Sequence, residues 1–296
     1  MVLGTPRSNP GSIESTGARS FLKWAGGKTR VASTIAGLVP KHFGTYIEPF
    51  CGSAAVFFAL QPARAVLNDA NEELVICLRA VRDDPDAVMA RLNRMPNTRD
   101  HFNKVRKQKS ERLSEVDRAA RLIYLNKTAF RGLWRVNRRG EFNTPYGEYQ
   151  RPYYNPATLL AASWLLRSAE LRCEDFDQVL RSAKQDDWVY LDPPYVPDRK
   201  WGDFTRYTAG RFGPDDQCRL AESIQRLDRK GVRWLMTNSD TAMVRELYSD
   251  FNLAILPTRR EITLRSADRE SRDLIVANYE FRPDGLVRRL PLLRRK

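Results

Sequence analysis

The residues best suited to chemistry form the segment Asp192-Pro193-Pro194-Tyr195, which follows the apolar residues 188–191. Because proline has no N–H, the proline pair ends the hydrogen bonding of a strand and leaves the Pro193 carbonyl free to accept a bond from another molecule. Together with the Asp192 carboxylate it offers two adjacent acceptors, which match the two N–H donors of an exocyclic amino group. Tyr195 adds a face on which a flat base can stack. A strand-ending turn with an aspartate cap is the simpler alternative. A second motif at residues 46–69, which suits a nucleoside, favours a binding site.

That second motif is YIEPFCGSAAVFFAL, residues 46–60, where a predicted strand runs into a turn of small residues and then a helix. The next predicted strand ends in Asp69, about 20 residues after the turn begins. In doubly wound sheets such a turn lets the backbone approach an adenosine, and the acid accepts from the ribose hydroxyls. Gly52 is the only glycine of the turn, which favours a nucleoside without a pyrophosphate. Ordinary α/β architecture can produce the same order of elements and stays open as an alternative.

A third stretch is FLKWAGGKTR, residues 21–30, with two adjacent glycines between Trp24 and Lys28. The glycines allow a tight fold of the backbone, so that the aromatic face and the ammonium group can converge on one ligand. The glycine spacing of a phosphate-binding loop is absent. A helix start preceded by an ordinary turn is the alternative.

The charge of the chain indicates a polyanionic partner. Its 296 residues include 50 Lys and Arg against 36 Asp and Glu, a formal net charge of +14. Residues 99–139 alone contain 13 basic and 4 acidic residues, interleaved with Phe102, Tyr124, Phe130 and Trp134. Such a mixture suits phosphates and bases better than a merely solvated helix face. Nucleic acid is therefore the first expectation, and an acidic membrane surface the second.

Cysteine and histidine usage argues against several other kinds of site. The scattered cysteines indicate neither a disulfide framework nor a metal site, and a reducing cytosol fits them best. Both histidines lie away from any serine or cysteine elbow, so a histidine base is not expected. No apolar run is long enough to span a bilayer, and the N-terminus lacks the core of a signal peptide. The residues concerned are Cys51, Cys77, Cys173, Cys218, His42 and His101.

These motifs need a sheet to position them. Short apolar runs alternate with helical patterns, which predicts an α/β fold with a mainly parallel sheet. The expected strands are 45–50, 63–69, 187–192, 232–237, 251–257 and 273–279, and the expected helices are 53–60, 71–82, 156–168, 214–229 and 240–249.

One interval interrupts this alternation and predicts an inserted domain. Residues 86–153 have helical patterns followed by a turn-rich stretch that suits a loop or hairpin, and they carry most of the excess charge. We therefore expect a discontinuous catalytic domain, 19–85 and 154–281, around a target-recognition domain, 86–153. The Ser-, Gly- and Pro-rich residues 1–18 predict a disordered lead, and 282–296 a basic tail.

Taken in order, these motifs resemble the Dam type (D12 class, alpha group) of DNA adenine-N6 methyltransferases. The resemblance covers about residues 21–279 and rests on FLKWAGGK, EPFCGS, NDAN, IYLNKTAFRGLWRVNRRGEFNTPYG, DPPY, TNSDT and RREITLRSADRESRDLIVANY. DPPY is shared with other amino methyltransferases, whereas FLKWAGGK and TNSDT are particular to this group. The resemblance implies a Rossmann-like sheet that uses S-adenosylmethionine, with an inserted, mostly helical DNA-recognition domain.

The resemblance also implies roles for residues at the matching positions. Asp192, Pro193, Pro194 and Tyr195 would hold a flipped adenine, and Asp192 would also border the cofactor. Direct methyl transfer to N6 then needs no nucleophilic side chain and no metal. The cofactor would be contacted by Trp24 and Lys28, walled by Glu48, Pro49, Phe50 and Gly52, bound at its ribose by Asp69, and bordered at its adenine by Asp175 and Phe176.

For DNA, the resemblance implies that Arg135 reads a guanine in the major groove and that Lys23 contacts DNA near the target. Further contacts would come from Leu133, Asn137, Pro145 and Tyr149. Two positions depart from the family pattern. Ala54 stands at a small or glycine position of the cofactor turn, and Arg131 stands where we expect an asparagine near the orphaned partner base. The expected site, GATC or a related sequence, is therefore left open.

Two alternatives to a DNA adenine methyltransferase remain. One is an enzyme of the same fold acting on cytosine N4 or an RNA base, against which the insert and FLKWAGGK argue. The other is an inactive DNA-binding protein on the same scaffold, against which the presence of Asp192 and Tyr195 argues. We expect double-stranded DNA as partner, a monomer in solution, and a cytoplasmic, nucleoid-associated protein encoded by a bacterium or phage. A cognate restriction endonuclease would be a further partner.

Overall fold

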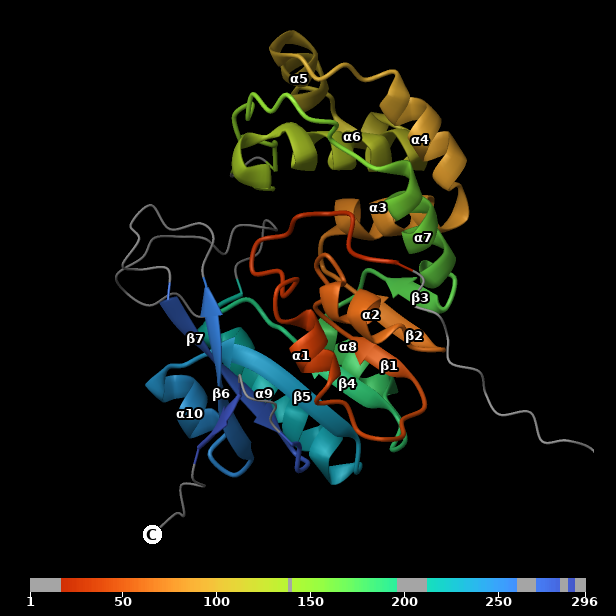
Figure 1. Cartoon of the computed structure of the whole chain (residues 1–296). Coiled ribbons are helices and arrows are strands. Elements are labelled where there is room, and N and C mark those ends of the chain that lie inside the picture. Colours follow the sequence, from red (N-terminus) through yellow and green to blue (C-terminus); the bar gives the residue numbers. More distant parts are fainter. Residues whose placement is uncertain (1–16, 138–139, 196–211, 260–269, 283–286, 291–296) are drawn as a thin grey trace, which may run out of the picture.

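The computed structural model describes residues 17–137, 140–195, 212–259, 270–282 and 287–290 (Figure 1). Its centre is one sheet with the strand order β3-β2-β1-β4-β5-β7-β6-β8. The first five strands in that order pair in parallel, while β7 is antiparallel to both β5 and β6. The strands are β1 (Tyr46–Glu48), β2 (Ala65–Asn68), β3 (Ala169–Arg172), β4 (Trp188–Leu191), β5 (Arg233–Ser239), β6 (Asn252–Arg259), β7 (Glu270–Ala277) and β8 (Arg288–Arg289).

The central strands are apolar on both faces because helices cover both sides of the sheet. Every residue of β1, β2 and β4 is buried. Along β4 the side chains alternate between two cores, with Tyr190 in one and Val189 and Leu191 in the other. The helices are α1 (Ala32–Ala36), α2 (Ala55–Leu60), α3 (Glu72–Asp83), α4 (Pro85–Asn93), α5 (Arg99–Arg106), α6 (Glu115–Thr128), α7 (Pro156–Leu166), α8 (Phe176–Ser182), α9 (Pro214–Arg229) and α10 (Ala242–Leu247).

The insert forms a helical layer of α4, α5 and α6 beyond α3 and α7 (Figure 1). Side-chain caps define where these helices begin, because each cap accepts from an otherwise unpaired N–H of the first turn. Asn71, Asp84, Thr98 and Ser114 cap α3, α4, α5 and α6 in this way. The turns η1 (Ser110–Arg112) and η2 (Phe130–Gly132) flank α6.

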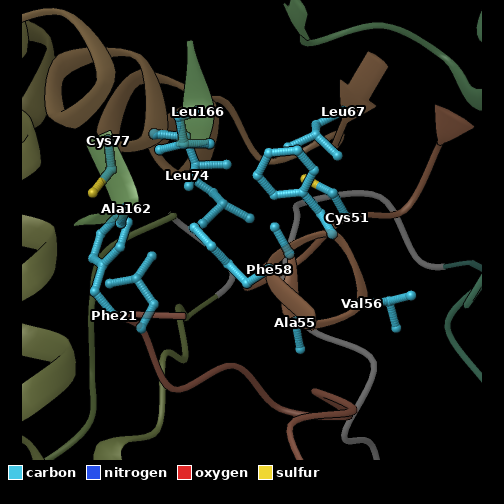
Figure 2. Packing of buried hydrophobic residues seen from close by; sticks show 14 of the residues in the cluster. Phe21, Cys51, Ala55, Val56, Phe58, Leu67, Leu74, Cys77, Ala162 and Leu166 are labelled. Atoms are coloured by element: carbon cyan, nitrogen blue, oxygen red, sulfur yellow. The ribbon is translucent and has the colours of Figure 1, made fainter. Parts of the chain in front are cut away.

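One hydrophobic core continues from the sheet into the insert. It joins residues of α2 and β2 through α3 and α7 to α6. Figure 2 shows the part of this core where Phe58 of α2 and Leu67 of β2 lie near Leu74 of α3 and Leu166 of α7. The helices α4, α5 and α6 therefore pack on the sheet through α3 and α7, and a displacement of α6 must be accommodated by α3, which it touches.

The predicted α/β class is confirmed, and each expected strand and helix overlaps an observed one. The sequence did not predict α1, α8, the edge strand β3 or the short strand β8. The sequence of β3, AELR, contains two charged residues among four and lacks an apolar run. Its pairing with β2 makes it a strand, and no local pattern reports that pairing.

The two ends of the chain lie mostly outside the described residues. Of the expected lead 1–18, only Gly17 and Ala18 are described, and Ala18 is buried in the main core. Of the expected tail, Arg288–Arg289 form β8 and pair with β6. The motif residues 260–269 also lie outside the described part. Within the part that is described, no helix is long and apolar enough to cross a membrane.

Candidate active site

The candidate site lies at the carboxyl ends of β1, β2 and β4. Because β1 lies between β2 and β4 and all three run in parallel, the residues that follow these strands meet at one edge. Asp69 follows β2, Pro49 follows β1 and Asp192 follows β4. This edge is where open α/β sheets bind ligands.

The Asp192 carboxylate is held by two side chains from distant segments. Lys28 Nζ donates to Oδ1 at 2.7 Å and to Oδ2 at 2.8 Å, and Thr237 Oγ1 donates to Oδ1 at 2.8 Å. Tyr190 Oη is 2.8 Å from Thr237 Oγ1 and must be the donor there, because the threonine proton is already used. Oδ1 thus accepts two hydrogen bonds, whereas Oδ2 accepts one from these partners and keeps a further lone pair for a ligand.

Burial raises the pKa of Asp192, and the Lys28 ammonium and the Thr237 hydrogen bond act against this increase. Lys28 is itself 7% exposed. The Asp192 side chain is 16% exposed, so the pair joins a buried ammonium to a carboxylate that a ligand can still reach.

Tyr195 is fixed by a second carboxylate. Its hydroxyl donates to Asp273 Oδ2 at 2.8 Å, and that oxygen is 3.8 Å from Lys28 Nζ. Lys28 Nζ also lies 4.8 Å from the centre of the Tyr195 ring. Burial raises the pKa of Tyr195 well above its usual range, so the phenol remains a hydrogen-bond donor.

The two prolines have different hydrogen-bond environments. Gln217 Nε2 donates to the Pro194 carbonyl at 3.0 Å, and Asn238 in turn donates to Gln217 at 3.2 Å. The Pro193 carbonyl accepts no hydrogen bond from any described residue. An acceptor beside Asp192 is thus free within the described structure, as its sequence predicts.

The turn after β1 brings Trp24, Gly52 and Asp69 together. Gly52 has a φ of +48°, and a Cβ there would lie 2.9 Å from Trp24 Cδ1, so only glycine fits. Asp69 accepts from Gly52 N and Asn71 N, each at 2.9 Å, and burial raises its pKa. Ala54 also adopts a left-handed φ, +53°, and so keeps a backbone conformation that glycine adopts more easily.

Glu48 lies at the floor of the same edge. It is almost fully buried and accepts from Tyr46 Oη at 2.9 Å. Burial raises the pKa of Glu48 well above its usual range. The Pro49 carbonyl accepts from Asn68 Nδ2 at 3.0 Å, which fixes the chain where it leaves β1.

Phe50, Asp175 and Phe176 gather around the start of α8. The rings of Phe50 and Phe176 lie 5.3 Å apart. Asp175 caps α8 and accepts two bonds from the Arg219 guanidinium, at 3.1 and 3.0 Å. That guanidinium also lies 4.4 Å from the centre of the Phe176 ring.

Five of the predicted DNA residues, Arg131, Leu133, Arg135, Asn137 and Pro145, lie on one hairpin after α6, marked by the bridges Ala129 to Tyr146 and Val136 to Phe142. Tyr149 follows this hairpin, and Lys23 lies in the loop before α1. Arg135 is exposed, and its Nε donates to Asn143 Oδ1 at 2.8 Å. Asn137 exchanges hydrogen bonds with Glu141. Leu133 is half-buried and Pro145 is exposed.

Arg131 has a φ of +57°, and its N–H donates to Tyr149 Oη at 2.8 Å. An asparagine adopts this left-handed conformation more readily than an arginine, so the backbone agrees with the residue type expected there. Lys23 joins this hairpin to the site, because its main chain pairs with Asn126 of α6.

The structure adds residues for which the sequence had indicated no role. Thr237 and Asn238 lie in the TNSDT motif, and Asp273 lies in the last strand motif, so a signal for them existed. Gln217 stands on α9 without any motif. A surface cavity of about 680 Å³ lies elsewhere, at the amino ends of β1, β2 and β3, and includes none of the predicted site residues.

The sheet and the site at its carboxyl edge define a Rossmann-like methyltransferase. The model of the D12 class N6 adenine-specific DNA methyltransferases matches residues 24–262. The chain belongs to this family, and its reaction is methylation of adenine in DNA.

Curated relatives agree with this assignment. The type II methyltransferase M1.LlaDCHI of Lactococcus lactis subsp. cremoris is 36% identical over 271 residues, which span 88% of this chain and 95% of the relative. The type II methyltransferase M.MjaIII of Methanocaldococcus jannaschii is 35% identical over 290 residues, with 88% and 99% covered. The DNA adenine methylase of Escherichia coli (strain K12) is 33% identical over 266 residues, with 88% and 95% covered.

Proposed function

We propose that the chain transfers a methyl group from S-adenosylmethionine to N6 of an adenine flipped out of duplex DNA, and that Asp192 and Pro193 activate N6. The observation that carries the proposal is the pairing of acceptors at the end of β4. Asp192 Oδ2 retains a lone pair beyond its bond to Lys28, and the adjacent Pro193 carbonyl has no described partner.

These two acceptors fit the two hydrogens of the adenine amino group. Accepting both draws the nitrogen lone pair out of conjugation with the ring and stabilises the positive charge that develops on N6 during methyl transfer. Lys28 and Thr237 hold the carboxylate in place, so little reorganisation is needed at the moment of reaction. Tyr195, anchored by Asp273, offers its ring for stacking on the base.

The residues after β1 and β2 fit S-adenosylmethionine, which supplies an activated methyl group when bound. The left-handed Gly52 permits close approach of the backbone. Asp69 keeps acceptor capacity beyond its two backbone bonds and would bind the ribose. Trp24 and Lys28, with Glu48, Pro49 and Phe50, would border the rest of the cofactor, and Asp175 and Phe176 would lie beside its adenine.

Lys127 of α6 and three cations close to it support DNA as the ligand. Burial, with the charges of Lys23, Arg151 and Arg19, lowers the pKa of Lys127 to about 8. In the described part of the chain, none of these four forms a salt bridge with an acid. A cluster of cations without acids suits a phosphate backbone.

With DNA as the substrate, we also propose a division into domains, a set of DNA contacts, a location in the cell and a partner. We propose that residues 86–153 form the target-recognition domain, inserted between 19–85 and 154–281 of the catalytic domain. Arg135, Arg131, Leu133, Asn137, Pro145, Tyr149 and Lys23 would contact DNA at GATC or a related sequence. The protein would act as a monomer in the cytoplasm, where the DNA lies, and a cognate restriction endonuclease would be its partner in a modification system.

The test uses purified protein, labelled S-adenosylmethionine and unmethylated genomic DNA. We expect label in N6-methyladenine, and sequencing of the modified bases will give the recognition sequence. Label in cytosine alone would favour the N4 alternative, and no label in any DNA would contradict the proposal. A parallel incubation with RNA tests the remaining substrate class.

Replacing Arg135 by alanine is expected to relax the choice of site. The side chain is exposed on the hairpin, and a bidentate contact to guanine contributes about 1–3 kcal/mol of discrimination. The ratio of kcat/KM between the preferred site and a site changed at one base pair should therefore fall by roughly 10-fold to 100-fold. Arg229→Ala, exposed at the end of α9, removes an equal charge outside residues 86–153 and should leave the ratio unchanged. An unaltered ratio in Arg135→Ala would exclude the readout role.

A further inference from the structure

Asn126 of α6 connects the insert to the loop that precedes α1. Its side chain is completely buried. Oδ1 accepts from Lys23 N at 2.9 Å, and Nδ2 donates to Lys23 O at 2.6 Å, so the amide pairs with the main chain of a residue 103 positions away. Nδ2 also donates to Gly132 O at 3.4 Å. One amide group therefore contacts both the loop and the hairpin.

Two further contacts join the hairpin to the same loop. Gly132 has a φ of +70°, and a Cβ there would lie 2.6 Å from Lys23 Cδ, so the hairpin backbone packs directly on the lysine stem. The rings of Trp134 and Trp24 stack with centres 6.3 Å apart and planes 20° apart. The hairpin that carries Arg135 is thus in contact with two consecutive loop residues.

The other end of the loop reaches the reaction site. Trp24 packs on Gly52 of the turn after β1, and Lys28 pairs with Asp192. The loop from Lys23 to Lys28 therefore runs from the hairpin to the Asp192 carboxylate. Asn126 fixes the main chain at the first residue of this loop.

We propose that Asn126 is a positioning residue that couples DNA recognition by the hairpin to cofactor binding and to the placement of Lys28 beside Asp192. The proposal rests on the proposed function. When DNA seats the hairpin, the contacts at Gly132, Trp134 and Asn126 hold the loop in the conformation that places Trp24 against the cofactor turn. By linkage, bound cofactor must strengthen binding of the correct DNA by the same factor.

The test measures this coupling directly by binding, with the full-length chain. The affinity for S-adenosylhomocysteine, which has no methyl group to transfer, is measured alone and with a duplex that carries the sequence the wild-type protein methylates. We expect the duplex to strengthen binding by about 5-fold or more in the wild-type protein, the usual lower range for coupled sites. In Asn126→Ala the factor by which the duplex strengthens binding of S-adenosylhomocysteine should fall close to unity. The ratio of kcat between the correct duplex and a duplex changed at a single base pair should fall as well.

A matched control is Asn278→Ala. Asn278 also bridges a distant main chain, accepting from Trp234 N at 2.9 Å and donating to Val232 O at 2.8 Å, but it touches neither the loop nor the hairpin in the described structure. In Asn278→Ala the duplex should strengthen binding of S-adenosylhomocysteine as much as in the wild-type protein. If Asn126→Ala does not fold, Asn126→Ser keeps an uncharged polar group whose shorter side chain cannot pair with both Lys23 N and Lys23 O.

Three outcomes would overturn the proposal. The duplex could leave the affinity of the wild-type protein for S-adenosylhomocysteine unchanged, or it could strengthen binding in the folded Asn126 variant as much as in the wild type. The strengthening could also fall equally in Asn278→Ala. These outcomes differ from failure of the proposed function, in which the wild-type protein would transfer no methyl group to adenine. A variant with normal coupling and low stability would assign Asn126 a purely structural role.

Discussion

Asp192→Asn is expected to abolish measurable methyl transfer while DNA binding persists. The amide keeps the size of the side chain but loses the negative charge and one acceptor, and it leaves the buried Lys28 ammonium without the anion that lies 2.7 Å away. Losing one preorganised electrostatic contact commonly lowers kcat by about 10²-fold to 10³-fold, and here the charge that faces N6 is lost as well. Single-turnover transfer to a saturating duplex measures the effect without interference from product release.

Asp187→Asn is the matched control. Asp187 is also buried and lies at the opposite end of β4, where it accepts from Thr45 N and Lys184 N, each at 2.9 Å. Its replacement should affect stability and leave the rate of transfer by folded protein near that of the wild type. A fully active Asp192→Asn would refute the proposed activation of N6.

Lys28→Met is expected to shift the pH profile of methylation rather than to remove activity at every pH. Burial already raises the pKa of Asp192, and Lys28 opposes that increase. Without the ammonium, the pKa of Asp192 must rise further, because Asp273 remains close to this site. The carboxylate accepts from N6 only when ionised, so the acid limb of the rate profile should move to higher pH.

On the acid limb, at pH values below the pKa of Asp192, the rate should fall by about tenfold for each unit by which that pKa rises, and it should recover as the pH rises. Lys28→Arg retains a cation and should keep its acid limb closer to that of the wild type. Lys230→Met, whose ammonium binds the exposed Arg181 carbonyl, is the control for loss of a lysine elsewhere. A profile that falls equally at every pH would show that Lys28 acts only through cofactor or DNA binding.

Local patterns predicted much of this fold. The buried runs of β1, β2 and β4 are visible in the sequence because strands covered on both faces are mostly apolar, and polar residues occur only at the carboxyl ends of β1 and β2. The start of α7 is visible because Asn155 caps it and Pro156 follows. The strand β3 was not predictable in this way, since it has alternating burial and charge at the edge of the sheet.

The site was predictable wherever the chemistry resides in consecutive residues. Asp192 to Tyr195 form one such segment, and Gly52 with its turn forms another. Thr237 and Asp273 lie in motifs of the sequence, but the sequence did not indicate what either side chain contacts. Gln217 lies in no motif, so nothing in the sequence indicated that it belongs at the site. Each of them acts through a side chain whose partner lies far away in the chain.

The amino-acid sequence by itself determined the class of protein, because the order of strands, turns and the DPPY segment is written in short stretches whose hydrogen-bonding capacity is local. Only the tertiary structure decided which side chains meet. Lys28 pairs with Asp192 across 164 positions, Tyr195 with Asp273 across 78, and Asn126 with Lys23 across 103. The physical reason is that periodicity reports burial along one element. The partner of a buried charge or amide depends instead on how the parallel strands and the helices packed on them bring distant loops to one edge of the sheet.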